Sequence, residues 1–115
     1  MNTYHTEKDM QLATTSKIAG YDIFETLGLV TGNMVQSKHI GRDLMAGLKS
    51  IVGGEIAGYT EMLTQSREAA QNRMIEQAQK LGADAVVNVR FTTSAIAQGM
   101  SELLAYGTAV KLQKK

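Results

Sequence analysis

Two side chains in this sequence have the type and spacing of metal ligands, because His39 and Asp43 stand four residues apart. On a helix this spacing places both on one face, where an imidazole and a carboxylate can hold a divalent ion. Glu55, Glu61 and Asp84 are further carboxylates that a fold could bring near them. The same spacing is also typical of a solvated surface pair, so a metal site at His39 and Asp43 is a hypothesis.

The absence of Cys limits which metal such a site would take. With two His and eleven Asp and Glu, the sequence favours zinc, nickel or harder ions over thiophilic ones. Seven Met are more typical of core filling than of soft-metal ligands. We therefore expect a divalent metal ion, if any cofactor is bound.

A second hypothesis concerns glycines near the start of a long helical segment, where Gly47, Gly53, Gly54 and Gly58 cluster before Tyr59. Free N–H groups at a helix N-terminus attract anions, and glycine lets a ligand approach the backbone closely. The pattern matches neither a P-loop nor a dinucleotide fingerprint. Two interpretations stay open: Gly53, Gly54 and Tyr59 bind a small or anionic ligand, or the glycines only break the helix and allow close packing.

Catalysis is not expected from this sequence. A chain without Cys has no thiolate nucleophile, no disulfide and no Cys-based metal site. Its Ser, His and Asp residues form no recognisable nucleophile motif. A third interpretation is therefore a scaffold protein that binds no metal, catalyses nothing and acts through its own assembly.

Length and charge narrow the class of protein further. We predict that residues 1–10 form a mobile arm and residues 11–115 a single domain. Twelve Lys and Arg against eleven Asp and Glu give a net charge of +1, interspersed along the chain, so neither nucleic acid nor a membrane surface is an expected partner. The N-terminus lacks the apolar core of a secretory signal, and no stretch approaches a membrane span. We expect a soluble cytoplasmic protein.

The elements that must position these residues follow from hydrophobic periodicity and turn residues. In chain order they are predicted as strands at 12–18 and 23–36, a short helix between Ser37 and Ile51, a long helix at 55–81, and strands at 83–91 and 101–112. The order β-β-α-α-β-β predicts an α+β fold, an antiparallel sheet of about four strands with both helices on one face.

Side-chain alternation assigns faces to two of the strands. Even-numbered positions from Phe24 to Met34 share one face of the second strand, and Val87, Val89 and Phe91 share one face of the third. We expect residues 94–99 to form a loose loop that joins the last two strands as a hairpin.

The long helix predicts self-association. At 1.5 Å per residue it extends about 40 Å, whereas a compact chain of this length has a radius of gyration near 13 Å. One apolar stripe follows three- and four-residue steps through Tyr59, Leu63, Ser66, Ala70, Met74, Ala78 and Leu81. Further apolar positions at Ile56, Met62, Ala69 and Ile75 lie outside it, so we expect a second face to pack on a neighbouring subunit. A break near Gly58 would shorten the helix and remove this requirement.

Several short motifs also occur in a characteristic order. They are Gly32, Ile-Gly-Arg-Asp at 40–43, Ile-Val-Gly-Gly at 51–54, Tyr59, Leu-Gly-Ala-Asp-Ala-Val at 81–86 and Gly-Thr-Ala-Val at 107–110. Over about residues 12–112 the chain resembles the YbjQ-like family. The resemblance implies a small bacterial or archaeal protein described as heavy-metal-binding, with a dodecin-like subunit fold. It also implies a ring-shaped homo-oligomer, a pentamer. Whether two such rings stack into a decamer stays open at this point.

Overall fold

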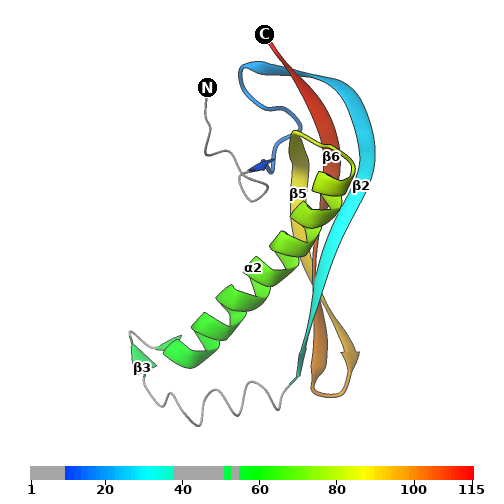
Figure 1. Ribbon diagram of the computed structural model, residues 1–115. Coiled ribbons are helices and arrows are strands. Elements are labelled where there is room, and N and C mark those ends of the chain that lie inside the picture. The colour runs from blue at the N-terminus through cyan, green and yellow to red at the C-terminus, as the bar shows by residue number, and fades with distance from the viewer. Residues whose placement is uncertain (1–9, 38–50, 53–54) are drawn as a thin grey trace.

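Two long antiparallel strands organise the fold, and one helix lies across them (Figure 1). The computed structural model describes residues 10–37, 51–52 and 55–115. Its elements are β1 (Gln11–Leu12), β2 (Tyr21–Ser37), β3 (Ile51–Val52), β4 (Glu55–Ile56), α2 (Ala57–Lys80), β5 (Ala85–Ala97) and β6 (Met100–Lys114). The main sheet has the order β1-β5-β6-β2, and β3 pairs with β4 in a separate two-stranded ladder. The α+β class is confirmed.

The helix α2 ends in the way the sequence predicts. Gly82 has a φ of 76°, which glycine adopts at little cost. The N–H of Gly82 donates to the carbonyl of Gln79 at 2.9 Å, and the N–H of Ala83 donates to that of Ala78 at 3.0 Å. This pair of bonds is a Schellman motif, which satisfies the last carbonyls of the helix and turns the chain into β5.

The main core lies between α2 and the sheet. Ala70, Met74 and Ala78 of the predicted stripe have no exposed surface, and they pack with Val30 of β2 and Val86 of β5. Leu63 and Leu81, from the same stripe, are exposed. The helix contacts mainly β2, less of β6 and very little of β5 (Figure 1). One part of the sheet is therefore left uncovered by α2.

Gly32 sets the distance between the helix and β2. A Cβ atom built on this residue would overlap the carbonyl oxygen of Ala70 and the backbone nitrogen of Met74, and would lie 2.9 Å from the carbonyl carbon of Arg73. Only a residue without a side chain allows two backbones to approach this closely. At this position the backbone of α2 therefore packs directly against the backbone of β2.

A smaller core cluster lies on the opposite face of the sheet. Ile18, Ala85, Val87 and Val110 are buried together there, with Ala13 and Leu112 packed at the edge. Ile18 belongs to the irregular segment between β1 and β2, which therefore covers the part of the sheet that it crosses. The predicted strand at 12–18 is wrong beyond Leu12, and β1 runs parallel to β5, so the sheet is mixed and not wholly antiparallel.

The predicted face of the third strand is wrong because β5 contains a bulge. The pairing with β6 shifts between Val87 and Arg90, and Asn88 has a φ of 54°. The extra residue reverses the alternation. Val87 accordingly lies in the smaller cluster and Val89 in the main core, on opposite faces of the sheet.

Two bulges have the same effect in β2. The register shifts between Ile23 and Glu25 and again between Thr26 and Gly28. Thr26 pairs with Val110, whose side chain belongs to the smaller cluster, whereas Val30 packs against α2. The even-numbered positions of this strand therefore do not share one face, as periodicity alone had predicted.

The β5–β6 hairpin is longer and tighter than predicted. Ala97 pairs with Met100, which leaves a turn of Gln98 and Gly99 where a loose loop over 94–99 was expected. Gly99 has a φ of 74°, as two-residue hairpin turns require. The predicted short helix between Ser37 and Ile51 falls largely on residues 38–50, outside the described residues.

Candidate functional site

The residues predicted to bind ligands fall mostly outside the described part of the chain. His39 and Asp43, the predicted metal ligands, lie in the segment 38–50, and Gly53 and Gly54 are also outside the described residues. Tyr59 belongs to the first turn of α2, but its side chain is not described. The metal and small-ligand sites therefore stay predictions.

Two of the carboxylates proposed as outer metal ligands are widely separated. Glu61 lies near the start of α2 and accepts a bond from Gln65 at 3.5 Å. Asp84 lies beyond the other end of the helix, which at 24 residues extends about 36 Å. Among the residues that the structure describes, no three His, Cys, Asp or Glu side chains form a group that could hold a metal ion. These two carboxylates cannot complete one site within a subunit.

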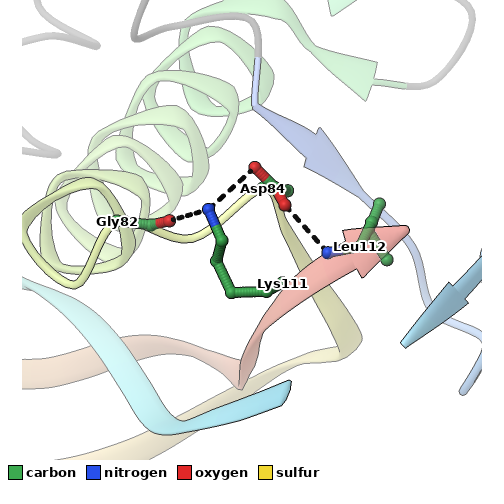
Figure 2. A network of polar contacts seen from close by, with 4 residues as sticks. All are labelled: Gly82, Asp84, Lys111 and Leu112. Atoms are coloured by element: carbon green, nitrogen blue, oxygen red, sulfur yellow. Dashed lines mark hydrogen bonds and ion pairs between the residues drawn. The ribbon is translucent and has the colours of Figure 1, made fainter. Parts of the chain in front are cut away.

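Asp84 has a structural role at the junction of α2 and β5. Figure 2 shows its carboxylate between Lys111 and Leu112. Oδ2 accepts the backbone N–H of Leu112 at 2.8 Å, and Oδ1 lies 3.5 Å from Nζ of Lys111, which also donates to the carbonyl of Gly82 at 3.1 Å. This network ties the end of the helix to β6. Both carboxylate oxygens of Asp84 therefore already have partners within the protein.

The outer edge of β2 carries a second set of polar contacts, made by side chains of α2. The Thr31 N–H donates to Oε1 of Gln77 at 2.9 Å, and the Arg73 guanidinium donates to the carbonyl oxygen of Asn33. Thr31 and Asn33 are two residues apart, so their backbone groups point to the same side of β2. Because these groups bond to side chains of α2, this side is the outer one, away from β6. The helix thus satisfies edge groups that would otherwise be open to another strand.

A buried polar contact joins α2 to β2 nearer the start of the helix. Ser66 is the buried polar residue of the described core, and its hydroxyl accepts a bond from the Gln36 side-chain amide. Buried polar groups need such partners to avoid a desolvation cost. Among the described residues, no buried side-chain nitrogen or oxygen lacks one, so this core holds no unsatisfied polar group aimed at a ligand.

The described surface instead offers exposed apolar side chains. Leu29 and Val35 of β2 lie on the sheet face opposite α2, and Leu29 is 71% exposed. Leu104 and Tyr106 of β6 lie between them on the same face and are half-buried. A sheet face of this composition usually packs against another layer. The candidate site of the described chain is therefore an interaction surface, which we call the open sheet face: Leu29, Val35, Leu104 and Tyr106.

The sequence did not predict the contacts of α2 with the outer edge of β2. Arg73 and Gln77 are four residues apart beside the inner stripe, a spacing that indicates one helix face but names no partner. Their partners are backbone groups of β2, about forty residues away in the sequence. The open sheet face had a weak signal, because odd-numbered apolar positions of the second strand could have been read as a second buried face.

The fold and site define a class of small α+β proteins. In the described part of the chain, one helix and the irregular segment between β1 and β2 cover parts of a mixed, bulged sheet. Within the described ranges, no helix combines the length and hydropathy of a membrane span. A family model described as "Putative heavy-metal-binding" matches residues 10–113. The chain belongs to this family, the YbjQ-like proteins, also called UPF0145 proteins.

Individual relatives support the assignment. A UPF0145 protein of Photobacterium profundum is 71% identical over 103 residues, covering 90% of this chain and all of the relative. One from Vibrio parahaemolyticus is 67% identical and is covered to 98%. A crystal structure of a protein of unknown function from Pediococcus pentosaceus, of the DUF74 family, aligns with a TM-score of 0.59 over 90% of this chain and 98% of that one. At 18% identity this last likeness shows the fold alone.

Proposed function

We propose that this protein works as a homo-oligomeric ring in the cytoplasm, without catalytic activity, and that the ring is the form in which any ligand is bound. One observation carries the proposal. Among the described residues, ten large hydrophobic side chains are exposed, and Leu29 at 71% is the most exposed of them. They lie on β2, β5, β6 and at α2, so several elements of the subunit offer apolar surface to other chains.

Each subunit of a closed ring contacts two neighbours, and a standard interface takes about 800 Å² from each partner. A closed ring requires two contacts of this kind, made by two different patches of the same chain.

Two different apolar patches are available for those contacts. The open sheet face of β2 and β6 is one, and the exposed side of α2 at Leu63 is the other. Because they lie on different elements, contact between them is head-to-tail and repeats around an axis. The resemblance to the YbjQ-like family supports five subunits.

Native mass spectrometry of the purified chain tests the ring. We expect a mass of five or ten copies of the 12.5 kDa chain, with a denatured sample giving the single-chain mass. Leu29→Lys should release monomers, because it places a charge among the apolar side chains of the proposed contact. Gln113→Lys adds the same charge at an exposed position of β6 and should leave the mass unchanged. A monomeric wild-type protein would contradict the proposal.

Metal binding is a second candidate function, favoured by the description of the family. The described residues form no metal site within one subunit. The candidate ligands are therefore His39 and Asp43, repeated around the ring. The alternative is a small or anionic ligand at Gly53, Gly54 and Tyr59, and a pure scaffold ring would bind neither.

Calorimetric titration with Zn²⁺ and Ni²⁺ tests the metal candidate. We expect saturable binding by the wild-type protein and at least a tenfold loss of affinity in the His39→Ala, Asp43→Ala double variant, since both ligand atoms are removed. His5→Ala removes the other histidine and serves as the matched control. Equal binding by the double variant and the wild type would show that these residues are not the ligands.

A further inference from the structure

The outer edge of β5 is hydrogen-bonded to other residues before Arg90 and is open after it. Before this residue the edge is covered, because Ala13 and Thr15 exchange backbone hydrogen bonds of 2.9–3.0 Å with Val86, Asn88 and Val89. The Arg90 guanidinium then donates to the carbonyls of Val89 at 2.9 Å and Thr14 at 2.8 Å. The covered part of the edge ends with this side chain.

Beyond Arg90 the edge is open. The Val89 N–H points to the outer side, so the backbone groups of Phe91, Thr93 and Ala95 point there too. Within the described ranges no hydrogen bond to this outer side is present, and β5 pairs only with β1 and β6. The hairpin extends past the region where α2 contacts the sheet (Figure 1). We call Phe91, Thr93 and Ala95 the β5 edge.

The β5 edge lies between two bulges and contains none, because the pairing with β6 is regular from Arg90 to Ala95 and shifts before and after this stretch. The sequence from Phe91 to Ala97 is Phe-Thr-Thr-Ser-Ala-Ile-Ala, without charge, Pro or Gly. Phe91 is 40% exposed and Ile96 51% exposed. Long neutral edges rich in β-branched and aromatic residues tend to pair with another strand.

The other edge of the sheet is protected. Along β2, Gln77 and Arg73 of α2 occupy the outer groups of Thr31 and Asn33. Nearer the start of β2, two bulges interrupt the strand, and bulges of this kind discourage pairing. Among the described strands, a second copy therefore finds on β5 a regular stretch of open backbone groups that β2 does not match.

We infer that the β5 edge pairs antiparallel with the β5 edge of a second copy across a two-fold axis at Thr93, and that this contact joins two rings face to face. The inference rests on the proposed ring for the number of copies. Because the regular open stretch lies on β5 in both copies, the pairing uses the same edge on both partners, as a two-fold contact does.

The β5 edge is complementary to itself in size and charge. With Thr93 on the axis, Thr93 faces its own copy, and Phe91 faces Ala95 of the second copy, so a large side chain meets a small one. Cross-strand Thr pairs are favourable, and no like charges face each other. The backbone N–H and carbonyl groups of Phe91, Thr93 and Ala95 point to the outer side of β5. Each of the three residue pairs across the axis can exchange two hydrogen bonds, which gives about six in all.

Charge variants of Thr93 test the inference by native mass spectrometry. Thr93→Asp and Thr93→Lys each place like charges opposite one another on the axis, so each variant alone should have about half the wild-type mass. An equimolar mixture of the two should recover the full mass, because Asp then faces Lys. Only a contact of Thr93 with its own copy predicts both the loss and this rescue. Asn72→Asp, an exposed residue of α2, adds the same charge and should leave the mass unchanged.

The outcomes separate this inference from the proposed ring. A wild-type mass of five copies, or a Thr93→Asp variant with the full wild-type mass, would overturn the β5 pairing and leave the ring standing. A wild-type dimer that Thr93→Asp converts to monomers would support the pairing and overturn the ring. A wild-type monomer would overturn both.

Discussion

Gly32→Ala is expected to lower the free energy of unfolding by on the order of 3 kcal/mol, enough to unfold much of a marginally stable chain. The added methyl group would overlap the backbone of Ala70 and Met74 and lie 2.9 Å from the carbonyl carbon of Arg73. Backbone atoms cannot rotate away as a flexible side chain can. Relief requires α2 to lift from β2, which would weaken the main core along its length.

Urea denaturation followed by circular dichroism at one fixed protein concentration measures this loss. Gly20→Ala is the matched control, because Gly20 has a φ of 85° but no atom within 4 Å of the added methyl. We expect it to cost only about 1 kcal/mol, the cost of a left-handed backbone for a residue with a side chain. Equal losses in the two variants would show that the close approach at Gly32 does not limit stability.

Met74→Ala is expected to cost about 2–5 kcal/mol, the range for large-to-small changes in a core. Met74 has no exposed surface and packs in the main core with Val30 and Val86. Among the described elements, α2 is the one helix that packs on this face, so few described side chains can move in to fill the cavity. The loss should therefore lie toward the upper end of the range.

The same denaturation experiment measures this effect, with Leu81→Ala as the control. Leu81 belongs to the apolar stripe predicted from the sequence, but it is 48% exposed. We expect its truncation to cost less than about 1 kcal/mol, since little apolar surface returns to water. A loss at Leu81 as large as that at Met74 would mean that the residue is covered in solution, as in an oligomer.

The sequence predicted long regular elements well because their signals are local. The helix was expected over 55–81 and is α2, Ala57–Lys80, and its Gly82 stop is confirmed by the Schellman bonds. The predicted strand at 23–36 is β2, Tyr21–Ser37. Both elements are long, so one or two irregular residues do not hide their type.

Side-chain faces were predicted less well because bulges leave little trace in a sequence. Asn88 tolerates a left-handed φ better than most residues, but Asn is common elsewhere, so its presence did not indicate a bulge. One such residue moved Val89 to the opposite face from Val87. The parallel pairing of β1 was also missed, because two residues carry no periodicity.

The contacts of α2 with the β2 edge were predicted least well, since they join distant parts of the chain. The Arg73–Asn33 and Gln77–Thr31 contacts depend on how α2 sits across β2, which Gly32 decides. The predicted ligands His39 and Asp43 stay a prediction of the sequence alone. What periodicity did indicate, a helix with apolar positions beyond one stripe, is the feature that led to the expectation of an oligomer.

The strand order has a consequence for how the chain is made. β6 lies between β2 and β5 and pairs with both, yet it follows the other described strands in the chain and is synthesised after them. Between the end of β2 at Ser37 and the start of β6 at Met100, a ribosome working at 5–20 residues per second needs roughly 3–13 s. During that time β2 has no strand partner among the described elements. The 17-residue segment of β2 therefore has unpaired backbone groups on both edges during this time. Because α2 is synthesised before β5 and β6, it is the element that can cover this segment first.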